Sequence, residues 1–263
     1  MKNICKRLLA LCLAALMLIS MTALAEDDLL EKIRARGSLI IATEGNWKPW
    51  TYHDENDKLT GFDVEVGRLI AGKLGVEAEF RETEWSALIA GVKSGLFDIA
   101  CNGFDYTPER AKSYDFSDPY VFTEIALVVR KDNEDIRSFE DLPGKVTSNS
   151  PSSTYAQRAE ALGASVVYVD AFDGTMMMVE QGRAEASINA LGTIQEYLET
   201  KPNANLKIVQ IVPGDPVCIP IRKGAGNAGL LAAINQVIAD ARADGSLAEL
   251  SLRFFGKDLT EAQ

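Results

Sequence analysis

The segment from Thr107 to Arg110 contains the residue types from which a carboxylate-binding site is built. Thr107 can cap a helix through its hydroxyl group, and Pro108 suits the first helical position. Arg110 then falls in the first turn, close to backbone N–H groups that have no partner within the helix. A guanidinium fork beside a positive helix end binds an anion well. The segment alone also fits a surface turn in which Arg110 pairs with Glu109 or Asp115.

The remaining reactive side chains exclude several kinds of site. The chain has one histidine, His53, which we expect to be solvated in a polar loop. Cys101 and Cys218 both lie in apolar runs, which favours buried thiols, although a disulfide between them stays open. These residues supply neither a zinc site nor a Ser-His-Asp set nor a Cys-His pair. We therefore expect no catalytic residue, no metal and no cofactor.

The first 25 residues have the pattern of a secretory signal peptide. Cationic residues precede an apolar run over 8–19, which is too short to span a bilayer comfortably, and the small-residue pattern ends at Ala25. We expect cleavage after Ala25 and an exported protein, periplasmic or extracellular, with attachment to the cell surface left open. Cleavage changes the formal net charge from -11 to -14 because the leader carries three cations and no carboxylate. The acidic balance excludes nucleic acid as a partner.

Short apolar runs alternate with amphipathic stretches, which is the pattern of parallel strands joined by helical crossovers. The first cycle has strands at 38–44, 76–82 and 97–103 and helices at 62–75 and 85–95. A second cycle contains, in chain order, strands at 125–131 and near Val146, a helix at 154–163, a strand at 165–170, a helix at 173–183, a strand at 184–189, a helix at 192–200 and a strand at 206–212. Its three consecutive methionines, 176–178, point around their helix, so we expect core packing there.

The last two helices, 230–245 and 247–256, have no sheet of their own. We therefore expect the chain to return to its first domain. Lobe 1 then comprises 26–124 and 216–263, and lobe 2 comprises 125–215. The predicted fold class is α/β, with two Rossmann-like lobes joined by a two-strand hinge and a ligand cleft between them.

Several motifs, in this order along nearly the whole mature chain, resemble the bacterial extracellular solute-binding proteins of the polar amino-acid class, family 3. They are SLIIATEGNWKPWTYHDENDKLTGFDVEV, WSALIAGVKSGLFDIACNGFDYTPERAKSYDFSDPY, DLPGK, SSTY, GRAEASIN, RKG and DGSLAELSLRFFG. The resemblance implies the type II periplasmic binding protein fold and a non-catalytic receptor of an ABC transporter. Its partners would be a free amino acid and a membrane permease, and we expect a monomer. The cystine-binding branch is the most similar, with the basic amino-acid and glutamine branches near neighbours.

The resemblance also implies which residues contact the ligand. Arg110 stands where the family binds the ligand α-carboxylate bidentately, which suits guanidinium geometry. Ser153 and Thr154, at a helix start, correspond to the second lobe's contribution to the same carboxylate. Relatives usually have glycine where this chain has Ser152. Gly103 is also predicted to contact the ligand. It belongs to the pair Asn102-Gly103, which is most similar to the cystine-type branch.

The partner of the ligand ammonium departs from the family pattern. Asn189 and Ala190 stand where an acid is expected. Asp105 occupies a place where relatives offer a hydroxyl, so we hypothesise that this acid meets the ammonium, since a buried ammonium without an acceptor is costly. The alternative is that Asp105 caps the following turn. Asn189 remains a predicted cleft residue.

The first strand is followed by an acid and two rings. Glu44 stands where relatives with cationic or extended ligands place an acid, and Trp47 and Trp50 stand where relatives carry stacking aromatic residues. Trp47 either stacks on the ligand or covers the lobe, and the same two alternatives apply to Trp50. Because some relatives are dehydratases of prephenate-like or arogenate-like substrates, an enzyme that uses Glu44 or Asp105 as an acid is the competing function.

Overall fold

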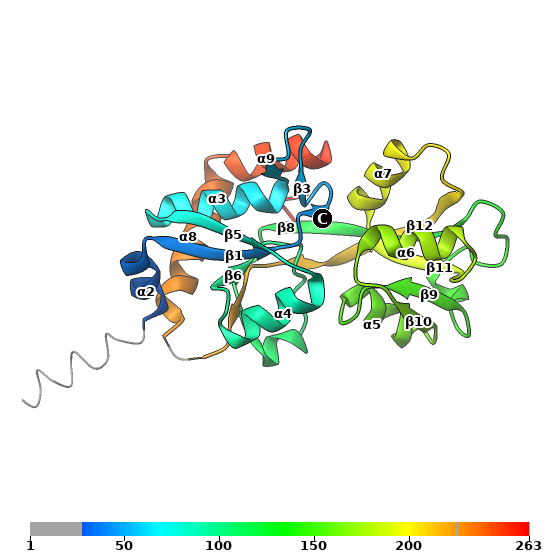
Figure 1. Ribbon diagram of the computed structural model, residues 1–263, viewed down its shortest axis with the longest axis horizontal. Helices are drawn as coiled ribbons and strands as arrows, with labels where there is room; N and C mark the ends of the chain where they lie inside the picture. The colour runs from blue at the N-terminus through cyan, green and yellow to red at the C-terminus, as the bar shows by residue number, and fades with distance from the viewer. Residues whose placement is uncertain (1–27, 225, 263) are drawn as a thin grey trace, which may run out of the picture.

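The computed structural model describes residues 28–224 and 226–262. The predicted signal peptide, residues 1–25, lies outside the described residues. Two five-stranded sheets organise the chain into two lobes that lie side by side, with helices on both faces of each sheet (Figure 1). No helix in the described part of the chain is long and apolar enough to cross a membrane.

Lobe 1 is built on the sheet of order β5-β1-β6-β13-β7. Its strands are β1 (Ser38–Thr43), β5 (Glu77–Glu82), β6 (Ile99–Ala100), β7 (Tyr114–Phe116) and β13 (Pro220–Arg222). Its helices are α2 (Leu29–Arg36), α3 (Phe62–Leu74), α4 (Trp85–Ser94), α8 (Ala228–Ala243) and α9 (Ser246–Phe255), with a 3-10 turn η1 (Arg110–Lys112). Strand β13 pairs with β6 and β7, so the chain returns to lobe 1 after lobe 2.

Lobe 2 is built on the sheet of order β10-β9-β11-β8-β12. Its strands are β8 (Val121–Arg130), β9 (Val146–Asn149), β10 (Ser165–Tyr168), β11 (Ala186–Ala190) and β12 (Leu206–Val217). Its helices are α5 (Thr154–Ala161), α6 (Phe172–Glu180) and α7 (Leu191–Thr200), with a 3-10 turn η2 (Phe139–Asp141). The parallel pairing of β9 with β10 and β11 confirms helical crossovers in this lobe.

Two long strands form the hinge. Strands β8 and β12 pair antiparallel, with two register shifts, and run as one ribbon from lobe 1 into lobe 2 (Figure 1). The predicted lobe boundaries, at 124/125 and 215/216, both fall inside these strands. The type II periplasmic binding protein fold is confirmed, while the exact lobe limits stay a prediction.

A small three-stranded sheet was not predicted from the sequence. It comprises β2 (Asn46–Trp47), β3 (Thr51–His53) and β4 (Leu59–Thr60). Strands of two or three residues carry no measurable alternation of apolar and polar side chains, so periodicity misses them. This sheet places Trp47 near the cleft.

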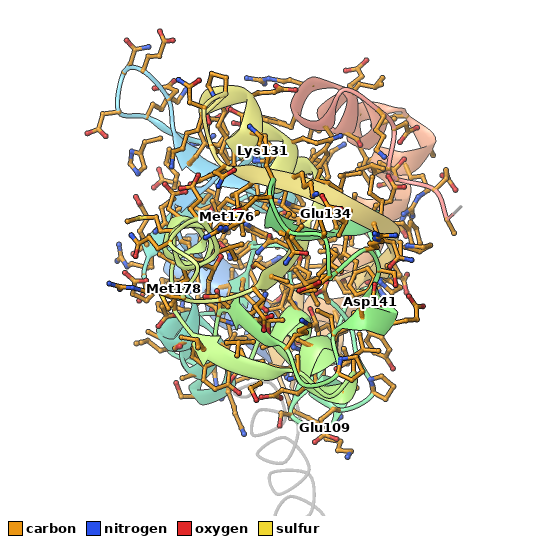
Figure 2. The ribbon with its side chains drawn as sticks, turned by 90° about the vertical axis from the view of Figure 1, so that its right-hand side faces the viewer. Glu109, Lys131, Glu134, Asp141, Met176 and Met178 are labelled. Atoms are coloured by element: carbon orange, nitrogen blue, oxygen red, sulfur yellow. The ribbon has the colours of Figure 1, made fainter. Side chains whose placement is uncertain are left out.

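The expected core packing is confirmed for Met176 and Met178 but not for Met177. Met176 is buried, Met178 is half-buried and packs on the same core, and Met177 points outward with 49% of its surface exposed. Met176 and Met178 lie on helix α6 in lobe 2 (Figure 2). Cys101 and Cys218 are both buried free thiols rather than a disulfide.

Candidate ligand-binding site

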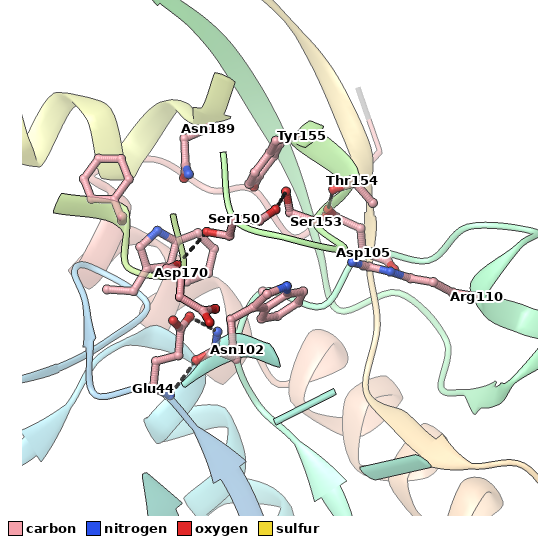
Figure 3. Close-up of a pocket in the computed structure, with 14 residues that line it drawn as sticks. Glu44, Asn102, Asp105, Arg110, Ser150, Ser153, Thr154, Tyr155, Asp170 and Asn189 are labelled. Carbon is pink, nitrogen blue, oxygen red and sulfur yellow. Dashed lines mark hydrogen bonds between the residues drawn. The ribbon is translucent and has the colours of Figure 1, made fainter. Parts of the chain in front are cut away.

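A cavity that is partly open to solvent lies between the two lobes. Its walls include residues at or just after the carboxyl ends of β1, β6, β9, β10 and β11, where α/β sheets bind ligands. Lobe 1 contributes Glu44, Trp47, Trp85, Asn102, Gly103, Asp105 and Arg110, and lobe 2 contributes Ser150, Ser153, Thr154, Tyr155, Asp170, Phe172 and Asn189 (Figure 3). The cavity therefore contains every predicted site residue except Trp50.

The helix predicted around Arg110 is only a short turn in the structure, η1, which begins at Arg110. The Thr107 hydroxyl accepts a hydrogen bond from the Arg110 N–H at 3.1 Å, so Thr107 caps the turn as expected. The helix is a single 3-10 turn because strand β7 begins at Tyr114. An α-helix with a positive end is not present here, so the guanidinium itself is the group suited to bind an anion.

The Arg110 guanidinium is buried at the cavity and bonded to both lobes. Only 8% of the residue is exposed. One terminal nitrogen donates to the Asp105 carbonyl at 2.9 Å, and the other donates to the Ser152 carbonyl of lobe 2 at 3.1 Å. The group also lies over the rings of Phe104 and Trp85, 4.4 and 5.5 Å from the ring centres. Burial lowers the pKa of Arg110 from its ordinary value, while the neighbouring Asp105 opposes this effect.

The alternative pairing of Arg110 with surface acids does not occur. Glu109 pairs with Lys112, and Asp115 lies 3.8 Å from Lys223. Arg110 is therefore a cavity residue rather than a member of a surface ion pair.

Asp105 faces the cavity and contacts the opposite lobe. Its carboxylate accepts a hydrogen bond from the Thr154 hydroxyl. Burial raises the pKa of Asp105 to about 6, although Arg110 and the Thr154 hydrogen bond both act to lower it. Since Thr107 supplies the cap of the turn, the Asp105 carboxylate is available on the cavity wall for another partner.

Lobe 2 approaches Arg110 with the start of helix α5. Ser153 is the N-cap: its hydroxyl accepts from the Ala156 N–H at 3.0 Å and donates to the Ser150 carbonyl at 2.7 Å. Ser152 has φ of 60°, in the left-handed region that glycine adopts more easily. The position where relatives carry glycine thus keeps the glycine-like backbone with a serine.

The other side of the cavity carries two more carboxyl groups. Glu44 accepts a hydrogen bond from the Asn102 amide at 2.7 Å. Burial raises the pKa of Glu44 to about 7, with smaller contributions from Glu84 and Asp170. Asp170, which was not predicted as a site residue, lies two residues after the end of strand β10, and its position near a strand's carboxyl end was the available signal.

The two tryptophans that follow β1 have different surroundings: Trp47 forms part of the cavity wall, and Trp50 belongs to the core. Trp47 lines the cavity and stacks on Trp50 with ring centres 5.2 Å apart and an interplanar angle of 9°. Trp50 is 1% exposed, packs on Phe62 and Phe255, and does not line the cavity. Its ring therefore supports Trp47 from behind.

Gly103 and Asn189 complete the predicted set. Gly103 has φ of 56°, and a Cβ atom there would lie 2.6 Å from the Trp47 ring, so this close approach requires glycine. The Asn189 side-chain oxygen accepts from the Ala190 N–H at 2.9 Å, and the residue lines the cavity from lobe 2. Within the described residues, no group of three or more His, Cys, Asp or Glu side chains could hold a metal ion.

Residues 39–257 match the family model of bacterial extracellular solute-binding proteins, family 3. The chain belongs to this family. It is 37% identical over 234 residues to a probable amino-acid ABC transporter-binding protein of Haemophilus influenzae, covering 89% of this chain and 91% of the relative. It is 36% identical over 239 residues to the L-cystine-binding protein TcyA of Bacillus subtilis, covering 90% and 88%. These relatives are transport binding proteins, so the non-enzymatic assignment is confirmed and the dehydratase alternative is not favoured.

Solved structures give the same fold. An ancestral arginine-binding protein bound to arginine is 36% identical, with a TM-score of 0.78 over 84% of this chain and 99% of that chain. The L-cystine solute receptor of Neisseria gonorrhoeae, in an unliganded open conformation, is 39% identical but has a TM-score of 0.59 over 89% and 100%. The TM-score to this open receptor is lower although the sequence identity is higher, as expected when the lobes of two proteins are set differently. Hydrogen bonds from Arg110 to Ser152 and from Thr154 to Asp105 join the lobes here, so this structure has the closed arrangement.

Proposed function

We propose that the interlobe cavity binds one free amino acid and that the lobes close around it for delivery to the membrane permease of an ABC importer. The observation that carries this proposal is the buried Arg110 guanidinium in the interlobe cavity, with carboxyl groups on the cavity walls. A zwitterion needs such an arrangement of opposite charges, and hinge closure removes both of its charged groups from water together.

Each end of the backbone of the amino acid has a partner in this proposal. Arg110 binds the α-carboxylate, assisted by the start of helix α5 at Ser153 and Thr154. Asp105 accepts hydrogen bonds from the α-ammonium, and Trp47 covers the side chain of the ligand. Gly103 lets the lobe 1 loop approach the ligand closely, and Asn189 contacts it from lobe 2.

The charges of the cavity select against acidic ligands. Arg110 stands against three carboxyl groups, Glu44, Asp105 and Asp170, among the described residues that line the cavity. A ligand with a net negative charge would meet an excess of like charge, so glutamate and aspartate are disfavoured. Cystine, basic amino acids and glutamine remain as the ligand classes of this site.

We further propose that residues 1–25 export the chain and are then removed, and that the mature protein acts as a monomer. The first part rests on the leader pattern in the sequence. Gel filtration and mass spectrometry of the secreted protein test both statements. A mature chain that begins elsewhere than at residue 26, or a stable dimer, would contradict them.

Scanning fluorimetry of the mature protein against the twenty amino acids, cystine and ornithine tests the proposed function. A ligand at 100 times its dissociation constant adds about 2.7 kcal/mol of stability, which raises the melting temperature by several degrees. We expect such a rise with at least one L-amino acid and none with the same compound lacking its α-carboxylate, for example agmatine in place of arginine. The absence of any response to every amino acid would refute the proposal.

A further inference from the structure

Asp170 of lobe 2 bonds to the first turn of helix α4 in lobe 1. Its carboxylate accepts from the Ser86 hydroxyl at 3.1 and 3.2 Å and from the Ser86 N–H at 3.4 Å. The N-cap residue of α4, Glu84, makes no side-chain cap hydrogen bond. The opposite lobe therefore supplies the cap of α4, and this contact exists only while the lobes are together.

A second bond at the same turn holds the same pair of lobes. The Trp85 indole N–H donates to the Pro151 carbonyl at 3.1 Å. The first two residues of α4 are thus both bonded to lobe 2 in the closed arrangement. The start of α4 is a closing contact of the cleft as well as part of the cavity wall.

Closing also places two carboxyl groups near each other. Asp170 and Glu44 come from opposite lobes and lie on the same side of the cavity, away from Arg110 (Figure 3). The negative charge of Asp170 contributes to the raised pKa of Glu44. Among the described residues that line the cavity, Arg110 is the one with a cationic side chain. Its guanidinium already donates hydrogen bonds to two carbonyl groups. In the empty closed form this side of the cavity therefore has excess negative charge.

We propose that Asp170 makes closure selective for an amino acid with a second positively charged group, such as a basic side chain or the second ammonium group of cystine. This inference rests on the proposed function and specifies its ligand class. The carboxylate of Asp170 has two effects. It caps α4 across the cleft, and its charge, opposite Glu44, attracts the distal cation of the ligand. A neutral distal group would leave the two carboxylates facing each other in a cavity partly shielded from water.

Three variants separate the charge of Asp170 from its capping contact. Asp170→Asn keeps an acceptor for Ser86 but removes the charge, since asparagine is also a good N-cap residue. Ser86→Ala removes the hydroxyl donor and leaves every charge in place. Asp173→Asn removes one negative charge from an exposed residue that pairs with Lys201 at 2.9 Å, outside the cavity, and serves as the matched control.

Calorimetry measures the dissociation constants for L-arginine against L-citrulline and for L-cystine against its mono-N-acetyl derivative. In each pair the second compound lacks the distal cation of the first. We expect the wild type to prefer the member with the distal cation in at least one pair. Asp170→Asn should weaken that member about tenfold or more and should not weaken the member that lacks the distal cation. Ser86→Ala should weaken both members of the pair equally, by roughly three- to tenfold, and Asp173→Asn should change neither.

The outcomes distinguish this inference from the proposed function. A wild type that binds amino acids without preferring the member with the distal cation in either pair overturns the inference and leaves the proposed function in place. Equal weakening of both members in Asp170→Asn, or no change in either, overturns it as well. A wild type that binds no amino acid at all refutes the proposed function and this inference with it.

Discussion

The two sides of the cavity differ in how their charges are balanced. On the Arg110 side, the guanidinium already donates to a carbonyl of each lobe, and the Asp105 carboxylate already accepts from Thr154 across the cleft. On the Glu44 side, two carboxyl groups from opposite lobes face each other. The first side can close with protein groups alone, whereas the second closes favourably only when a cation, or a proton, is present.

This difference assigns separate tasks to the two sides. In the proposed function, the Arg110 side binds what all amino acids share, which is a carboxylate and an ammonium group. In the same proposal, the Glu44 side binds the remainder of the ligand, and the charge of that remainder affects closure. Each of the following predictions changes one side and leaves the other in place.

A large loss of affinity is expected from Asp105→Ser, because this variant removes the proposed partner of the ligand ammonium. Amino-acid affinity should fall by about 10- to 100-fold, since a buried ammonium without a charged acceptor loses a charge-assisted hydrogen bond. Calorimetric titration measures the change. Asp118→Ser, at an exposed acid of lobe 1, is the control and should bind as the wild type does. Unchanged affinity in Asp105→Ser would assign the ammonium to another group.

The Glu44 side should make closure of the ligand-free protein depend on pH. The pKa of Glu44 is raised to about 7 and that of Asp105 to about 6 in the closed form, mainly by burial. Solvent reaches both groups in an open form, where their pKa values are lower, so closing takes up protons. The empty closed form should therefore gain population as the pH falls from about 8 towards about 5.5.

The radius of gyration from small-angle X-ray scattering follows this closure. It should decrease as the pH falls through that range in the wild type. Glu44→Gln removes the group with the higher pKa, so its radius should be smaller at about pH 8 and its remaining pH dependence should lie near pH 6 or below. An identical profile in the wild type and the variant would show that Glu44 does not oppose closure.

A smaller effect is expected from Ser152→Gly beside Arg110. Ser152 has φ of 60°, a conformation that costs an L-residue about 1 kcal/mol more than glycine. The variant should raise the free energy of unfolding by up to about 1 kcal/mol, reduced by the extra freedom of glycine in the unfolded chain. Chemical denaturation measures it. Ser165→Gly, in the edge strand β10, is the control and should lower stability instead.

Local patterns predicted most of the fold. Helices α3 and α4 were predicted over 62–75 and 85–95, and their C-cap residues are Gly75 and Gly95, both with positive φ. The return of the chain to lobe 1 followed from two terminal helices without a sheet. Periodicity and turn chemistry act over a few residues, so they reveal elements whose side chains repeat over several turns or strand positions.

The parts of the site that sequence reasoning missed depend on contacts across the cleft. The position of Asp170 near the end of a strand was a weak signal, and its contacts with Ser86 and its influence on Glu44 arise from residues that lie far away in the chain. Trp47 and Trp50 are both buried, so burial alone does not tell which ring faces the cavity. Arg110 was found because its residue type, its cap and the family resemblance all indicated the same role.

The central claim is that Arg110 binds the α-carboxylate of the ligand, and titration calorimetry of the wild type and Arg110→Ala is its sharpest test. The titrant is the amino acid that responds best in scanning fluorimetry. The account predicts a single site per chain in the wild type and a loss of affinity of about 100-fold or more in the variant, because the α-carboxylate is then buried without its cation. Circular dichroism shows whether the variant keeps its fold. A folded Arg110→Ala protein that binds the amino acid as tightly as the wild type would contradict the account.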